Sequence, residues 1–180
     1  MMMPRCLRFL HIAFGLAAHV LLLGTTSAQQ TLTPIRATEN VYYFQGDSGM
    51  ASTANHAFNS NAAFIVTRDG VVVFDALGTP ELGAAMRRAI ATVTPQPIRV
   101  VIVSHFHADH FYGLQSLKGE GVEIWAHAAG RAAIGSEFTG SRLEQRRRDL
   151  APYDDTVLVM PSMRHLKPGN TQVRLGRYDP

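Results

Sequence analysis

The sequence predicts a layered α/β protein, and three observations support this prediction. Two apolar, β-branched runs at 62–67 and 71–75 flank an Asp-Gly turn, which is a strong signal for a β-hairpin. An amphipathic helical pattern follows, and a nearly continuous apolar run stands at 98–103. Strands that alternate with helices along a chain indicate helices packed against a sheet.

The elements around the hairpin follow from local composition. Residues 41–45 (VYYFQ) predict a first strand, and the segment 46–61, rich in Gly, Ser, Asn and Ala, predicts a loop. Thr79 is expected to cap a helix that begins at Pro80, because apolar side chains then recur on one face as far as Val93. Two prolines shortly afterwards end this helix.

The rest of the chain is expected to continue the alternation. The run at 98–103 (IRVVIV) has the composition of a strand buried on both faces. Further elements are predicted as a short helix from Phe111, a strand at 122–126, helices at 128–134 and 141–150, and a strand at 172–175.

Residues 1–28 have the layout of a secretory signal peptide. Two arginines precede an apolar run at 9–23, and small residues end the segment at Ala28, where cleavage is expected. The apolar run is shorter than the roughly 18 residues that a membrane-spanning helix needs. We therefore expect an exported protein, periplasmic or secreted, with one domain at 29–180 and no stable membrane association after cleavage.

Composition excludes several classes of function. Cleavage after Ala28 removes Cys6, the only cysteine, so the remaining 152 residues contain neither a thiol nucleophile nor a cysteine metal ligand. It also leaves 15 basic and 14 acidic residues, a net charge of +1, which argues against a nucleic-acid partner. The basic cluster 146–148 is expected to be the solvated face of a helix.

One short segment carries a chemically informative cluster. Ser104-His105-Phe106-His107-Ala108-Asp109-His110 follows directly after the apolar run at 98–103, so three histidines and a carboxylate occupy six residues. Side chains at the carboxyl end of a strand can converge on one point, where α/β proteins place their sites. Imidazole and carboxylate groups are natural ligands for Zn²⁺, and also for non-haem iron or manganese. The segment therefore predicts a metal centre.

This segment resembles the signature of the metallo-β-lactamase superfamily, in which H-x-H-x-D-H follows a hydrophobic strand. The segment 61–75, followed by a Thr-Pro helix, is also similar to the opening of that family's domain. The resemblance implies an αβ/βα sandwich with the metal site at one edge of the paired sheets. It also implies Zn²⁺ as cofactor, two ions per complete domain, with iron as an alternative.

The resemblance assigns roles to individual residues. His105 and His107 would bind the first metal, and Asp109 and His110 the second. Asp75 matches an aspartate that supports the site from behind the ligands, although an ordinary turn residue at a strand end remains equally compatible with its position.

The reaction that the resemblance implies is hydrolysis of a small molecule. A metal-bound hydroxide would attack an ester, thioester or amide (lactam) carbonyl, and Asp109 would act as a catalytic residue by orienting it. Three alternatives remain open. The chain could be a true metallo-β-lactamase, an iron-dependent oxidoreductase similar to persulfide dioxygenases, or a truncated and inactive metal-binding fragment.

The sequence departs from the family pattern in its second half. The family's later histidine in a G-H-T-like loop, its bridging aspartate and its final histidine have no match. Outside the motif, His56 and His165 are expected in loops and His127 at the start of a helix. We therefore expect the first half of the sandwich only, truncated, with apolar surface left uncovered on the inner face of its sheet.

Overall fold

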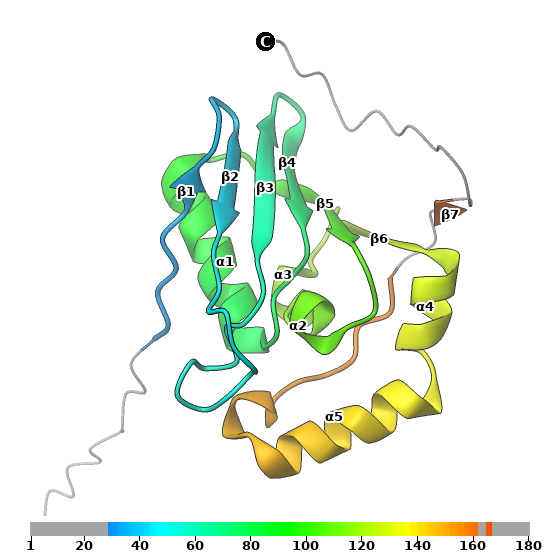
Figure 1. The fold of residues 1–180 in the computed structure, drawn as a ribbon. Helices are drawn as coiled ribbons and strands as arrows, with labels where there is room; N and C mark the ends of the chain where they lie inside the picture. The colour runs from blue at the N-terminus through cyan, green and yellow to red at the C-terminus, as the bar shows by residue number, and fades with distance from the viewer. Residues whose placement is uncertain (1–28, 162–164, 167–180) are drawn as a thin grey trace, which may run out of the picture.

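The computed structural model describes residues 29–161 and 165–166, which form one mixed sheet with helices packed against it (Figure 1). The strands cross the sheet in the order β1 to β7, antiparallel from β1 to β4 and parallel from β4 to β7. This arrangement confirms the predicted α/β class. The strands are β1 (Ile35–Arg36), β2 (Val41–Phe44), β3 (Ala62–Thr67), β4 (Gly70–Phe74), β5 (Ile98–Val103), β6 (Glu123–His127) and β7 (His165–Leu166).

The hairpin β3–β4 and the helix α1 (Pro80–Val93) lie where they were predicted. The Thr79 hydroxyl accepts a hydrogen bond from the Leu82 amide at 3.1 Å and so caps the helix. Buried side chains on one face of α1, such as Met86 and Ile90, share a hydrophobic core with Val71 and Val73 of β4. The core therefore lies between α1 and one face of the sheet.

The other face of the sheet is less covered. In β5, Val101 and Val103 are buried against the helices, whereas Val100 and Ile102 on the opposite face are only half-buried. The prediction of a strand buried on both faces is therefore wrong. The expectation of an uncovered inner face holds only in part. Val100 and Ile102 on that face are partly exposed, but Val72, which pairs with Val100, is only 3% exposed.

Two helices begin earlier than the sequence predicts. Helix α2 (Ala108–Phe111) begins three residues before Phe111. His107 is its N-cap and has an extended backbone, and the chain turns into the helix directly after it. Helix α5 (Glu137–Asp149) begins four residues before Ser141, with Ser136 as its cap. Within the described part of the chain, no helix is long and apolar enough to span a membrane.

Short elements complete the fold. Helix α3 (Leu114–Leu117) packs against α1, and η1 (Ala151–Tyr153) follows α5. His127 ends β6 and caps α4 (Ala128–Ile134), as expected of a residue at a helix start. The backbone at His165 belongs to β7, paired with Ala126, so the prediction of a loop there is wrong. The predicted signal segment 1–28 and strand 172–175 lie outside the described residues.

A close backbone approach joins α2 and α3 to the end of β4. The Gly113 amide, between the two short helices, donates to the Leu77 carbonyl at 3.1 Å. A Cβ atom at Gly113 would lie 2.0 Å from the Ala76 carbonyl oxygen, which is far inside van der Waals contact. Glycine at this position therefore allows the β5–α2 segment to lie against the residues that follow β4.

Candidate metal centre

The histidine-rich segment occupies the junction between β5 and α2, at the carboxyl end of the parallel strands. His105 lies in the short loop after β5, His107 is the N-cap of α2, and Asp109 and His110 belong to its first turn. The ring centroid of His105 is 4.7 Å from that of His107 and 4.1 Å from that of His110. The structure thus brings the three imidazoles together.

Asp75 connects the end of β4 to both ends of this segment. Its Oδ1 accepts a hydrogen bond from the Ser104 amide, and its Oδ2 accepts from the Ser104 hydroxyl and from Nδ1 of His110, all at 2.8 Å. Asp75 is only 8% exposed and has a φ of 62°, a conformation that aspartate tolerates better than most residues. Its carboxylate therefore acts as a buried anchor, behind His110.

These hydrogen bonds select the tautomers of two imidazoles. The Ser104 hydroxyl donates its single proton to Asp75, so at 2.9 Å it accepts from Nδ1–H of His105. Nδ1 of His110 likewise donates to Asp75. In the neutral forms, both residues therefore present an unprotonated Nε2, which is the atom that a metal ligand needs.

The same contacts move the two histidine pKa values in opposite directions. Burial lowers the pKa of His105 below its ordinary 6.5, and the neighbouring charges of His110 and His107 lower it further, while Asp75 and Asp109 partly oppose this. Burial also acts to lower the pKa of His110, but the hydrogen bond to Asp75 and the charges of Asp75 and Asp109 outweigh it and raise the pKa. Without a metal, His110 is thus the imidazole that protonates more readily.

Asp109 is held by a loop that sequence reasoning did not connect with the site. The Asn59 side-chain amide donates to Oδ2 of Asp109 at 3.3 Å, and the Ser60 hydroxyl donates to the Asp109 carbonyl. Oδ2 of Asp109 also lies 3.5 Å from Nε2 of His110. Asn59 and Ser60 belong to the segment 46–61, whose composition indicates only a loop, and no local signal marks them as neighbours of the motif.

The residues present fit a metal ion by the chemistry of their donors. Within residues 29–161 and 165–166, no group of three or more His, Cys, Asp or Glu side chains is already arranged to hold one ion. However, the described part of the chain supplies two oriented Nε2 atoms, a third imidazole and a carboxylate at the carboxyl end of β5. A second carboxylate, that of Asp75, lies behind the His110 imidazole, and this is a common support for metal ligands. Zinc accepts this ligand set.

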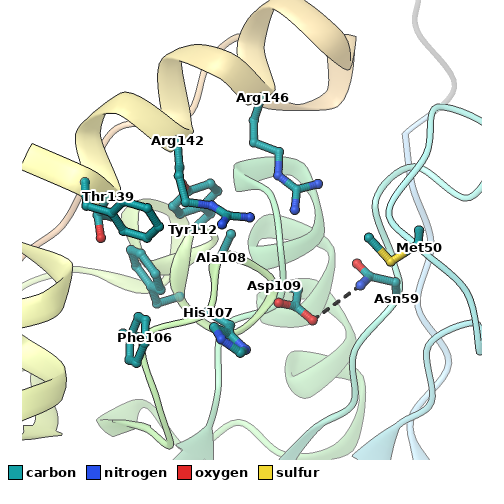
Figure 2. A pocket seen from close by; sticks show the side chains of 12 residues that line it. Met50, Asn59, Phe106, His107, Ala108, Asp109, Tyr112, Thr139, Arg142 and Arg146 are labelled. Atoms are coloured by element: carbon teal, nitrogen blue, oxygen red, sulfur yellow. Dashed lines mark hydrogen bonds between the residues drawn. The ribbon is translucent and has the colours of Figure 1, made fainter.

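Two pockets flank Asp109. The larger, of about 580 Å³, lies between the motif, the loop before β3 and α5, and both His107 and Asp109 line it (Figure 2). The smaller, of about 350 Å³, is lined by His110 and by residues of the segment 45–61. A small molecule that enters the larger pocket therefore meets the histidine-rich segment directly, whereas His56 lines neither pocket.

The basic cluster 146–148 differs from its prediction. Arg148 is exposed, as expected of a solvated helix face. Arg146 instead is half-buried and lines the larger pocket, with its guanidinium 5.6 Å from the ring centroid of Tyr153. Arg147 is half-buried and donates to the Thr156 carbonyl. The prediction of a solvated face is therefore wrong for two of the three arginines. The reason is that α5 packs against η1 and lines the larger pocket.

The comparisons with known proteins identify the family. A family model described as the metallo-beta-lactamase superfamily matches residues 57–179, more than half of the chain. The chain belongs to this superfamily. Its members are generally hydrolases and typically bind metal ions such as zinc. Among curated proteins, no sequence matches the chain.

Solved structures of the superfamily's fold are similar to this chain over part of their length. A metallo-beta-lactamase from Hirschia baltica is 17% identical, with a TM-score of 0.51, and the match covers 81% of this chain and 57% of that one. The inverting sec-alkylsulfatase Pisa1 from Pseudomonas sp. is 22% identical, with a TM-score of 0.50, over 64% of this chain and 18% of that one. These matches support the metallo-β-lactamase-type fold, and this chain spans between about a fifth and three fifths of these neighbours' lengths.

Proposed function

We propose that this chain carries the metal-binding half-site of an exported, zinc-dependent hydrolase. The network centred on Asp75 is the observation that supports this proposal most strongly. It orients His110 directly and His105 through Ser104, so that both present an unprotonated Nε2. His105 lies beside His107 and His110 beside Asp109, and these two neighbours line the larger pocket. Buried carboxylate–imidazole networks of this kind are costly as structural devices but useful as supports for ligands.

Each residue of the segment has a role in this proposal. His105 and His107 would hold one zinc ion, and Asp109 and His110 would contribute to a second. Bound zinc supplies Lewis acidity and a water molecule that is acidic near neutral pH. Asp75 keeps the proton of His110 on Nδ1, and Asn59 restrains the Asp109 carboxylate by donating to its Oδ2. Asp109 would also orient the nucleophilic water as a catalytic residue.

The reaction proposed is hydrolysis of an ester, thioester or amide carbonyl in a small molecule. The larger pocket is of the size that small-molecule ligands occupy. It opens to His107 and Asp109 on one side and is bounded by apolar and basic side chains on the other. This arrangement leaves room for a carbonyl near the proposed zinc ligands and for a larger substituent away from them.

Zinc binding and hydrolysis in matched variants test the proposal. The full chain is depleted of metal, titrated with zinc against a chromophoric chelator, and assayed with 4-nitrophenyl acetate and nitrocefin. His107→Asn is compared with His127→Asn, because both histidines occupy helix N-cap positions, where asparagine is favoured. We expect His107→Asn to weaken zinc binding at least tenfold and to remove zinc-dependent turnover, whereas His127→Asn leaves both near wild type.

The outcomes separate the remaining hypotheses. Nitrocefin turnover that requires zinc identifies a true β-lactamase, and ester turnover without it identifies another hydrolase. Iron rather than zinc in the protein as isolated, measured by elemental analysis, favours the oxidoreductase alternative and contradicts the zinc proposal. Equal zinc affinity in the wild type and in His107→Asn shows that the segment is not the metal centre. Zinc binding without turnover of any ester or lactam identifies a metal-binding fragment.

We also propose that residues 1–28 direct export and are removed. The support is the sequence pattern alone, since these residues lie outside the described part of the chain. The intact mass of the protein recovered from the periplasm or the medium tests this. A mass equal to residues 29–180 supports export with cleavage, whereas a full-length product in the cytoplasm contradicts it.

A further inference from the structure

Two arginines above the larger pocket have no anionic partner among the described residues. Arg142 and Arg146 lie one turn apart on α5, and Figure 2 shows both guanidinium groups directed from the helix toward the side of the pocket that holds His107 and Asp109. Within residues 29–161, neither guanidinium forms a hydrogen bond or an ion pair. Their neighbours on the helix differ, since Arg147 pairs with Glu144 and Arg148 donates to Gln145.

Aromatic rings position these two guanidinium groups. The guanidinium carbon of Arg142 lies 5.5 Å from the ring centroid of Phe138, and that of Arg146 lies 5.6 Å from the ring centroid of Tyr153. A cation–π contact leaves the N–H groups at the edge of the guanidinium plane free to donate. Both arginines are therefore partly ordered while their donors remain available to a ligand.

Exposed apolar side chains also line the same pocket. Among the described residues, six large hydrophobic side chains are exposed, and three of them line this pocket: Met50 at 79% exposed, Phe106 at 42% and Phe138 at 61%. They come from the loop before β3, from the β5–α2 junction and from α5. Three separate segments thus place exposed apolar surface around one pocket, which marks a ligand site more than a chance arrangement.

We propose that the substrate is an amphiphilic organic anion, whose oxyanion is bound by Arg142 and Arg146 and whose apolar part contacts Met50, Phe106 and Phe138. This inference rests on the proposed function for the identity of the site and adds the class of substrate. The ionisable side chains that line the pocket are two arginines, His107, Asp109 and Tyr112, and burial raises the pKa of Tyr112 so that its hydroxyl stays neutral. Two cations against one carboxylate favour a negative ligand, the more so if Asp109 is neutralised by a metal ion.

The oxyanion can be a carboxylate or a sulfate, because a guanidinium donates to either in the same way. A phosphate monoester would present the same oxygens with a higher charge. What the pocket requires is the combination of an oxyanion and an apolar chain on one small molecule. A neutral molecule with the same chain would leave both guanidinium groups unpartnered and bind more weakly.

Methyl NMR of the metal-free full chain tests this inference without any assay of turnover. The methionine methyl groups are labelled with ¹³C, because Met50 lines the pocket and Met86, buried in the core, serves as an internal control. Octanoate, octyl sulfate and octanol are titrated separately below their micellar concentrations. We expect the Met50 signal to move saturably with at least one anion, which binds at least fivefold more tightly than octanol, while the Met86 signal stays fixed.

Variants on one helix identify the groups that recognise the anion. Arg142→Gln and Arg146→Gln should each weaken anion binding about tenfold, the expected effect of losing a charge-assisted hydrogen bond. Arg148→Gln removes the same charge from the same helix, two residues beyond Arg146 on the exposed side, and should change the affinity less than twofold. Raising the ionic strength should weaken the binding of the anions and leave the affinity for octanol unchanged.

Several results would overturn the inference. Octanol binding as tightly as both anions would show that the apolar surface alone binds the ligand. An equal loss in Arg148→Gln would show that only the net charge of the helix matters. Absence of any saturable shift at Met50 would exclude the pocket.

The inference and the proposed function fail in distinguishable ways. Arginine-dependent anion binding without any zinc-dependent hydrolysis would support the proposed anion site and contradict the proposed hydrolase function. Zinc-dependent hydrolysis in a chain that binds anions no more tightly than octanol would support the proposed hydrolase function and contradict the proposed substrate class.

Discussion

Two regions of the candidate site are built differently. The region that we call the strand-end wall consists of Asp75, Ser104, His105 and His110, which adjoin the pocket-lining His107 and Asp109 without lining the larger pocket themselves. Its side chains are linked by hydrogen bonds of 2.8–2.9 Å. The other region, called here the helix wall, consists of Phe138, Thr139, Arg142 and Arg146 of α5, which line the larger pocket. Within residues 29–161, its two guanidinium groups contact rings but no hydrogen-bond acceptor.

This difference separates two tasks of a binding site. Groups that hold a metal must be placed within a fraction of an ångström, so they need partners that restrain their rotamers and tautomers. Groups that recognise the remainder of a substrate can stay adaptable, because long side chains adjust to the ligand. The strand-end wall therefore matches a ligand-holding role, and the helix wall matches a role in selecting among substrates.

The largest effect is expected from a comparison of two glycine variants. Gly113 lies next to the strand-end wall and Gly140 lies on the helix that forms the helix wall. Gly113→Ala would place a Cβ atom 2.0 Å from the Ala76 carbonyl oxygen, next to Asp75, so the backbone must shift. We expect a loss of about 2–3 kcal/mol in the free energy of unfolding. Gly140→Ala on α5 meets nothing within 4 Å, and we expect a gain of about 0.5–1 kcal/mol because alanine favours the helix. Urea unfolding measures both.

The zinc affinity of the Gly113→Ala variant sharpens the same comparison. If the strand-end wall depends on this close approach, zinc binding should weaken together with stability. Equal stability of the two glycine variants would show that the end of β4 adapts as readily as α5 does, and the distinction between the walls would then be lost.

Asp75→Asn tests the anchor of the strand-end wall. Asparagine tolerates the positive φ of Asp75, so the backbone is preserved. The loss of the carboxylate behind His110 should weaken zinc binding about 10- to 100-fold, the effect known for groups that support a metal ligand from behind. Chelator competition measures this. Asp69→Asn, in the β3–β4 turn, is the control, and an equal loss there would contradict a specific role for Asp75.

Local patterns explain what could be predicted from the sequence. The hairpin, the Thr79 cap and the apolar face of α1 depend on residues close together in the chain, and the structure shows them where expected. Helix α2 begins earlier than the sequence pattern predicts, because a residue such as His107 is compatible both with the end of a strand and with a helix N-cap. The contacts of Asn59 and Arg146 with the site depend on where a long loop and a distant helix fold back, which no local pattern encodes.

The titration of His110 shows how strongly Asp75 acts without a metal. The hydrogen bond and the charge of Asp75 raise the pKa of His110 against the effect of burial. In Asp75→Asn the carboxylate is gone and burial remains, so the pKa of His110 should fall. An NMR titration of the imidazole signals in the metal-free chain measures it. An unchanged pKa would show that Asp109, rather than Asp75, controls the charge of His110.

The smallest expected effect concerns the stability contributed by the helix wall. Arg142 is exposed and has no hydrogen-bond acceptor among the described residues, so Arg142→Gln should change the free energy of unfolding by less than about 0.5 kcal/mol. Arg147→Gln should cost about 1–2 kcal/mol, because Arg147 pairs with Glu144 and donates to the carbonyl of the buried Thr156. Urea unfolding of the two variants checks this difference. A loss above 1 kcal/mol in Arg142→Gln would mean that this arginine stabilises the fold, and its availability to a ligand would then need another explanation.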